Sequence, residues 1–183
     1  MRVISGSARG RKLKEPVGNK IRPTSDKVKE SVFNIIQFDV EGRNVLDLFA
    51  GSGQYGIEAL SRGAKSVTFV DTATESVKLI KENLKICGFS DSAFVYARDA
   101  IRFLDGDETY DLIFIDPPYD SLLADRAVRK IVEFDKLNNN GIIICESKAG
   151  TATSAVASPY FLQKEYKYGG VLITKYFRHE ILS

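Results

Sequence analysis

The sequence predicts an α/β protein built on a doubly wound, mostly parallel sheet with an antiparallel edge. Three observations support this prediction. Short apolar runs alternate with amphipathic helical patterns between residues 45 and 146. A glycine-rich turn joins the first of these runs to the helix that follows it. Two strand patterns at 160–168 and 171–178 flank Gly169-Gly170, which is typical of a hairpin turn.

Length and composition predict one domain over residues 1–183, divided into a basic N-terminal extension at 1–20 and a core at 21–183. No apolar run is long enough to cross a membrane, and the N-terminus lacks a signal-peptide core, so we expect a cytoplasmic protein. Cys87 and Cys145 lie in apolar contexts and are expected to be buried free thiols. With a single histidine in the chain, we expect no metal centre.

The N-terminal extension carries most of the positive charge. Residues 1–30 have a net charge of +6, whereas the whole chain has +2. Residues 2–4 and 12–14 are expected to be short strands around a Gly/Ser/Arg turn, which together form a basic β-hairpin. Such a segment suits a polyanionic partner, although a merely solvated charged face is the simpler alternative.

The remaining elements follow in order. A helix is expected after a cap at Thr24 or Ser25, and Gly88 is expected to end a later one. Residues 138–141 are expected to form a turn. The expected strands are 45–49, 66–71, 94–97, 110–116 and 142–146, and the expected helices are 26–36, 57–63, 72–87, 101–104 and 122–134.

The turn after the first strand has the spacing G-x-G-x-x-G, formed by Gly51, Gly53 and Gly56. Glycines allow a sharp turn and a close approach of backbone to ligand, and the next helix directs free N–H groups toward it. Asp71 ends the second strand about twenty residues on, where a carboxylate suits ribose hydroxyls. The pattern predicts a nucleoside-containing cofactor and does not say which one. A strand–helix turn without a ligand is the alternative.

Three acids fall at or near the carboxyl ends of successive strands, namely Asp71, Asp99 and Asp116. Open α/β sheets bind ligands at this edge, so the three acids are expected to lie near one site. Asp99, or the backbone beside it, is positioned to meet an adenine amine. Each acid taken alone is equally consistent with an ordinary helix cap or a solvated side chain.

The stretch Asp116-Pro117-Pro118-Tyr119 has a more specific chemical meaning. The amine of a nucleobase is a poor nucleophile because its lone pair is delocalised into the ring. A carboxylate and a carbonyl that accept the two amine hydrogens would draw the nitrogen toward tetrahedral geometry and expose that lone pair. Prolines fix the direction of the carbonyl, and Tyr119 offers a face on which the base can stack. The alternative is a proline turn that stops a strand.

These motifs resemble a known family. Asp-Leu-Phe-Ala-Gly-Ser-Gly at 47–53 together with Asp-Pro-Pro-Tyr at 116–119 resembles class I S-adenosylmethionine-dependent methyltransferases that act on base amines. Residues 6–13, 22–34 and 58–64 narrow the match. From Ile4 to about Phe177 the chain is similar to the bacterial 16S ribosomal RNA guanine-N2 methyltransferase family (RsmD-like).

The resemblance implies a Rossmann-like class I methyltransferase with a seven-stranded sheet. It implies that Asp116, Pro117, Pro118 and Tyr119 serve the target guanine in 16S ribosomal RNA, either free or in a partly assembled small subunit. Arg9, Arg11 and Lys12 are expected to contact the RNA. The residues expected to serve S-adenosyl-L-methionine are Asp47, Phe49, Ala50, Gly51, Gly53, Asp71, Asp99, Ala100, Arg22 and Thr24. We expect a monomer.

Two positions depart from the family pattern. Asp71 stands where the family typically has Glu. Gln54-Tyr55 stands where smaller residues are commoner in the loop, and we assign no role to Gln54-Tyr55. Three other functions are also consistent with parts of this sequence. A DNA adenine-N6 methyltransferase also uses Asp-Pro-Pro-Tyr, but the chain has no inserted target-recognition domain. An NAD-dependent oxidoreductase would explain the glycines and Asp71, and a non-catalytic RNA-binding module would explain the basic extension.

Overall fold

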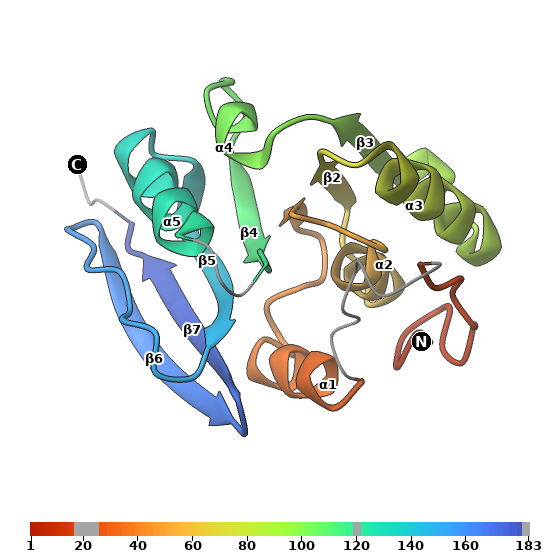
Figure 1. Cartoon of the computed structure of the whole chain (residues 1–183), viewed down its shortest axis with the longest axis horizontal. Coiled ribbons are helices and arrows are strands. Elements are labelled where there is room, and N and C mark those ends of the chain that lie inside the picture. The colour runs from red at the N-terminus through yellow and green to blue at the C-terminus, as the bar shows by residue number, and fades with distance from the viewer. Residues whose placement is uncertain (17–25, 119–121, 181–183) are drawn as a thin grey trace.

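The computed structural model describes residues 1–16, 26–118 and 122–180. Helices and strands alternate through most of this part of the chain (Figure 1). The elements are α1 (Asp26–Ile35), β1 (Asn44–Leu48), α2 (Gln54–Ser61), β2 (Ser66–Asp71), α3 (Thr74–Cys87), a 3-10 turn η1 (Ser90–Ser92), β3 (Ala93–Ala97), α4 (Ala100–Phe103), β4 (Tyr110–Ile115), α5 (Leu123–Glu133), β5 (Leu137–Lys148), β6 (Tyr160–Tyr168) and β7 (Val171–Arg178).

The seven strands form one sheet in the order β3-β2-β1-β4-β5-β7-β6. The pairs from β3 to β5 are parallel, and β7 is antiparallel to both β5 and β6. The predicted doubly wound sheet with an antiparallel C-terminal hairpin is therefore confirmed. The chain runs outward from β1 to β3 and then returns to the other side of β1 as β4. The carboxyl ends of β1 and β4 thus form the switch point at which such sheets bind ligands.

Helices cover both faces of the sheet (Figure 1). Buried side chains of α1, α2 and α3 pack on one face, and those of α4 and α5 pack on the other. Successive side chains of a strand point to opposite faces of the sheet, so each strand contributes to the core on both faces. In β1, Val45 faces the first set of helices, whereas Leu46 and Leu48 face the second. Cys87 and Cys145 are buried and free, as predicted.

The predicted turn at 138–141 is wrong, because these residues belong to β5. The asparagines are held by partners far away in sequence. The Asn138 side chain donates to Asp111 (2.8 Å), and Arg43 donates to the carbonyls of Asp111 and Asn140 (both 3.0 Å). Asn140 has a φ of 60°, and the register with β4 shifts between Tyr110 and Leu112. The turn-forming residues therefore make an irregularity within a strand.

The N-terminal hairpin is shorter than predicted. A single antiparallel bridge joins Arg2 to Lys12, and the predicted strands at 2–4 and 12–14 do not extend beyond it. The segment instead contributes buried apolar side chains, Val3, Ala8 and Leu13, to the core cluster that contains residues of α1, α2 and α3. Among the residues that the structure describes, no helix is long and apolar enough to cross a membrane.

Candidate active site

Four acids lie at the carboxyl ends of the four neighbouring parallel strands on one face of the sheet. Register places Asp47 of β1 beside Phe114 of β4, and Ile115 of β4 beside Cys145 of β5. Residues two positions before each acid pack with α1, α2 and α3, so alternation turns the acids toward these helices as well. The four acids, in sheet order, are Asp71, Asp47, Asp116 and Glu146.

The glycine loop turns sharply above the end of β1. Phe49, Gly51 and Gly53 all have positive φ, at 60°, 55° and 77°. Phe49 is the unusual member, because a bulky side chain rarely adopts this conformation outside a site that the surrounding structure constrains. The loop is fixed by hydrogen bonds from the Ala50 amide to the Val70 carbonyl (3.0 Å) and from the Gly53 amide to the Ala50 carbonyl (2.7 Å).

The third glycine of the motif has a packing role. A Cβ on Gly56 would lie 2.3 Å from the Phe69 ring and 2.7 Å from Val67, so α2 can approach β2 this closely only with glycine here. Gly56 is not among the residues with positive φ. Its requirement follows from helix–sheet contact, whereas Gly51 and Gly53 are needed for the turn itself.

Asp47 is a buried carboxylate beneath this loop. The Gly56 amide donates to it at 2.9 Å, and 1% of the residue is exposed. Burial raises the pKa of Asp47 well above its ordinary value, and the nearby acids Asp116 and Asp71 raise it further, while the Gly56 hydrogen bond opposes the shift. Among the described residues, no lysine or arginine forms an ion pair with Asp47.

Asp71 and Asp99 both accept hydrogen bonds from backbone amides. Asp71 is half-buried and accepts from Gly51 (2.8 Å) and from Ala73 (2.8 Å), so it fixes the glycine loop from the neighbouring strand. Asp99 is exposed and caps α4 by accepting from the Arg102 amide (2.8 Å). Ala100 is buried directly after it. Both carboxylates therefore have a structural role that the sequence offered as an alternative to ligand binding.

The Asp-Pro-Pro stretch leaves the sheet where β4 ends. Asp116 is half-buried, Pro117 is buried and Pro118 is exposed. Asp116 lies close enough to Asp47 and to Tyr55 to raise the pKa of each. Three predicted site residues, Tyr119, Arg22 and Thr24, lie outside the described residues.

Sequence reasoning missed the pair formed by Tyr55 and Glu146. Both side chains are buried, and the Tyr55 hydroxyl donates to Glu146 at 3.0 Å. The Tyr55 ring stacks on Phe114 with a centroid distance of 5.1 Å. A sequence signal was present for Glu146, because it directly follows the apolar run at 142–145, near the end of β5. No local signal marks its partner, since Tyr55 stands 91 residues earlier in the chain.

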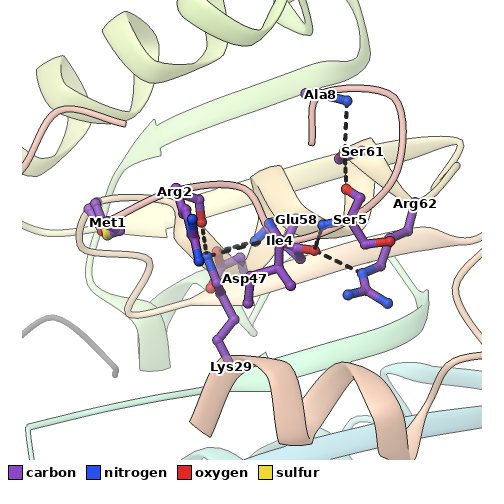
Figure 2. Close-up of polar contacts among 12 residues, drawn as sticks. Met1, Arg2, Ile4, Ser5, Ala8, Lys29, Asp47, Glu58, Ser61 and Arg62 are labelled. Carbon is purple, nitrogen blue, oxygen red and sulfur yellow. Dashed lines mark hydrogen bonds and ion pairs between the residues drawn. The ribbon is translucent and has the colours of Figure 1, made fainter. Parts of the chain in front are cut away.

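A second polar network fixes the N-terminal segment to α2 (Figure 2). The buried Glu58 carboxylate accepts from the amides of Ile4 (2.7 Å) and Ser5 (2.9 Å) and from the Arg62 side chain (2.9 Å). Lys29 of α1, also buried, lies 3.7 Å from Glu58 and donates to the Arg2 carbonyl at 2.7 Å. Sequence reasoning missed this network, because its members come from three segments.

The three predicted RNA-contacting side chains, Arg9, Arg11 and Lys12, are all exposed. Arg11 lies along α3, where it donates to the Ile86 carbonyl at 2.9 Å. Lys14 forms an ion pair with Glu82 of the same helix at 2.9 Å. Lys14 lowers the pKa of the exposed Glu82 by hydrogen bonding, and Lys78 and Lys85 contribute by charge. The N-terminal segment and α3 therefore form one basic surface.

Comparison with known proteins agrees with this geometry. Residues 1–177 match the family described as "Conserved hypothetical protein 95". Bacillus subtilis YlbH is 40% identical over 96% of this chain and 98% of its own length. Ribosomal RNA small subunit methyltransferase D of Haemophilus influenzae is 37% identical over 81% of this chain and 79% of its own. The chain belongs to the family described as "Conserved hypothetical protein 95", the family of ribosomal RNA small subunit methyltransferase D.

A solved structure supports the membership. The structure of Escherichia coli yhhF superimposes with a TM-score of 0.88, is 31% identical, and covers 98% of both chains. The family assignment therefore applies to the whole sheet, including the antiparallel hairpin and the N-terminal segment. It also confirms the resemblance that the glycine loop and Asp-Pro-Pro-Tyr suggested from the sequence.

Proposed function

We propose that the chain transfers a methyl group from S-adenosyl-L-methionine to the N2 amine of one guanine in small-subunit (16S) ribosomal RNA. The observation that carries this proposal is the position of Asp116 and Pro117. They follow β4 directly beside the glycine loop, so acceptors for a nucleobase amine adjoin a cradle for a nucleoside. Similarity to ribosomal RNA small subunit methyltransferase D of Haemophilus influenzae supports ribosomal RNA of the small subunit as the substrate.

The residues at the sheet edge fit this cofactor. The crowding of Asp47, Asp71 and Asp116 favours a ligand with positive charge, and the backbone at Gly51 and Gly53 leaves room for close approach. When bound, S-adenosyl-L-methionine supplies a methyl group activated by positively charged sulfur. The holding residues would be the loop 49–53 with Asp47 beneath it, Asp71 at the ribose, and Asp99 with Ala100 at the adenine. Arg22 and Thr24, which lie outside the described residues, would also serve the cofactor.

The residues after β4 would activate the amine. The Asp116 carboxylate and the Pro117 carbonyl each accept one hydrogen, which makes the nitrogen more tetrahedral and directs its lone pair at the methyl group. Asp116 or water then takes the proton that the nitrogen loses on methylation. Pro118 stiffens the loop, and Tyr119 would stack on the extruded base. Positioning and electrostatics suffice for this chemistry.

The RNA backbone would lie on the basic surface formed by Arg9, Arg11 and Lys12 with α3. The exposed lysines of α3, at 78, 81 and 85, extend this surface beyond the residues that the sequence suggested. Phosphate contacts of this kind orient a nucleic acid and carry no sequence information. We therefore expect selection of the guanine to depend on RNA shape, as in a partly assembled small subunit. The enzyme would act as a cytoplasmic, single-domain monomer.

The test is transfer of a labelled methyl group from S-adenosyl-L-methionine. The substrates are unmodified small-subunit ribosomal RNA, the same RNA assembled with its proteins, and double-stranded DNA, and the products are digested to nucleosides and identified by mass. N2-methylguanosine in RNA supports the proposal, and the better RNA form identifies the substrate state. N6-methyladenine in DNA would replace the proposal with the adenine enzyme. Absence of label in all three would contradict it.

A further inference from the structure

Asn83 of α3 is fully buried where the glycine loop and the N-terminal segment both contact this helix. Its oxygen accepts a hydrogen bond from the Lys14 amide at 2.8 Å. Its nitrogen donates to the Lys14 carbonyl at 3.2 Å and to the Ser52 carbonyl at 3.1 Å. A side-chain amide has two N–H donors, so Asn83 gives one hydrogen to the loop and one to the segment.

Ser52 lies at the centre of the glycine loop, between Gly51 and Gly53. Both glycines have positive φ, and glycine restricts the backbone least, so the direction of the Ser52 carbonyl depends on the contacts that it makes. The Ser52 side chain is buried, and its hydroxyl donates to the Met1 sulfur at 3.4 Å. The loop is therefore connected to the N-terminal segment twice, once directly and once through Asn83.

The loop also packs on α3 one turn before Asn83. A Cβ on Gly53 would lie 3.1 Å from the Ile80 side chain and 3.3 Å from the Phe69 ring. Ile80 is fully buried and precedes Asn83 by three residues, which places both side chains on the same side of the helix. This side of α3 faces the loop, so a displacement of the loop would change the position of the carbonyl that Asn83 binds.

Lys14 follows Arg11 and Lys12, two of the basic residues that we expect to contact RNA. Arg11 is itself held on α3, because its side chain donates to the Ile86 carbonyl at 2.9 Å. Asn83 binds both the N–H and the C=O of Lys14, so it fixes the backbone at this end of the segment beside α3 (Figure 1). One buried side chain thus joins the backbone of the proposed RNA-binding segment to the backbone of the proposed cofactor loop.

We propose that Asn83 is a positioning residue that couples the two binding sites, so that S-adenosyl-L-methionine and ribosomal RNA each strengthen the binding of the other. A cofactor that orders the glycine loop also fixes the Ser52 carbonyl, and through Asn83 it holds the Lys14 backbone. RNA then binds a segment that is already ordered, which lowers the entropic cost of binding. The effect is reciprocal, because each ligand must change the affinity of the other by the same factor. The inference rests on the function proposed above.

The experiment measures the affinity for unmodified small-subunit ribosomal RNA with and without saturating S-adenosyl-L-homocysteine, the product that remains after methyl transfer. This product has no sulfonium charge, so direct attraction between cofactor and RNA does not contribute. We expect the wild type to bind RNA about fivefold more tightly when the product is present. In Asn83→Leu this ratio should fall to about one, because leucine has a similar size and bonds neither segment. A purely structural role would weaken both affinities equally and preserve the ratio, which would overturn the proposal.

Glu82→Gln is the matched control. Glu82 precedes Asn83 on α3 and forms an exposed ion pair with the Lys14 ammonium at 2.9 Å. Loss of an exposed ion pair has little effect on the position of a backbone, so RNA affinity should change equally with and without the product. The ratio should remain about fivefold in this variant. A ratio of one in Glu82→Gln would overturn the role assigned to the Asn83 amide.

Hydrogen exchange followed by NMR tests the same link in the wild type, so it does not depend on the folding of Asn83→Leu. The Lys14 amide, which Asn83 accepts, should exchange about fivefold more slowly when S-adenosyl-L-homocysteine is bound. The Ala149 amide, which donates to the Gly170 carbonyl at 2.9 Å, is the control for general stabilisation. An unchanged rate at Lys14, or equal slowing at Ala149, would overturn the inference. Selective slowing at Lys14 in a protein that does not methylate RNA would support the link and contradict the function proposed above.

Discussion

Asp47 and Glu58 are two buried carboxylates, eleven residues apart, that differ in how their charge is balanced. Glu58 is fully buried, and its partners are Lys29, Arg62 and two backbone amides. Asp47 is equally buried, yet it accepts a hydrogen bond from the Gly56 amide, and its charged neighbours Asp116 and Asp71 are acids. The protein compensates the first charge from its own residues and crowds the second with like charge.

The difference separates a structural site from the functional site that we propose. The Glu58 network joins the N-terminal segment, α1 and α2, so its role is to hold these segments together (Figure 2). The acids at the sheet edge lie at the switch point beside the glycine loop, where positive charge on a ligand would relieve their repulsion. A buried acid with a raised pKa beside such a loop is a better indication of function than burial alone.

The largest expected effect comes from Asp116→Ala, at the functional site. It removes one acceptor from the target amine, so we expect kcat to fall about 1,000-fold. Binding of S-adenosyl-L-methionine, measured by calorimetry, should change little. Asp107→Ala, in the exposed turn before β4, is the control and should retain full turnover. Full turnover in Asp116→Ala would contradict the mechanism.

At the structural site, Glu58→Leu should lower the free energy of unfolding by about 3–5 kcal/mol, because Lys29 is left buried without its carboxylate. Urea unfolding measures this loss. Burial lowers the pKa of Lys29, and Glu58 opposes that shift, so the unpaired amine is also expected to lose its proton more easily. The double variant Lys29→Met/Glu58→Leu should recover part of the stability. A double variant as unstable as the single one would show that the ion pair is not the cause.

The basic surface is expected to contribute through charge alone. Replacing Arg9, Arg11 and Lys12 by alanine should reduce the slope of log affinity for RNA against log salt by about 2 to 3. Lys164 and Lys167 are exposed on β6, at the opposite edge of the sheet from β3, and their double alanine variant is the control (Figure 1). An unchanged slope in the triple variant would assign RNA binding to a different surface.

The smallest effect concerns the pH dependence of stability through Asp47. Its pKa in the folded state is raised, so the folded protein binds this proton more tightly than the unfolded chain does. Stability from this group is therefore present below its ordinary pKa of 3.8 and is lost as the pH rises through the folded-state value. Asp47→Asn removes the titrating group, so its stability relative to the wild type should increase with pH, by about 1 kcal/mol. Urea unfolding at several pH values measures the difference.

Asp91→Asn is the control for this prediction, because Asp91 is exposed and distant from the acids at the sheet edge. Its stability relative to the wild type should be nearly the same at every pH. If Asp47→Asn shows no greater pH dependence than Asp91→Asn, then burial of Asp47 does not oppose folding. Asp47 and Glu58 would then differ in their position in the fold and not in the energetic cost of their burial.

Much of the fold could be predicted because its signals are local. Strand and helix periods, the C-cap at Gly88 and the hairpin at Gly169-Gly170 each depend on a few consecutive residues. The turn at 138–141 was predicted wrongly for the same reason. Asparagine and glycine favour turns locally, but Asp111 and Arg43 hold this stretch in β5. Contacts across the sheet override local preference there.

The candidate site also has some features with local sequence signals and others that depend on contacts between distant segments. The amino-acid sequence alone predicts the glycine loop, the acids at or near the ends of successive strands and the Asp-Pro-Pro-Tyr stretch, because each depends on residue order along one short segment. Three further features are visible in the folded chain alone: the contact with Phe69 that requires glycine at position 56, the hydrogen bond from Tyr55 to Glu146, and the hydrogen bonds by which Glu58 fixes the N-terminal segment. These contacts join residues brought together by strand order and helix packing, and no local pattern encodes which buried charge will meet its partner.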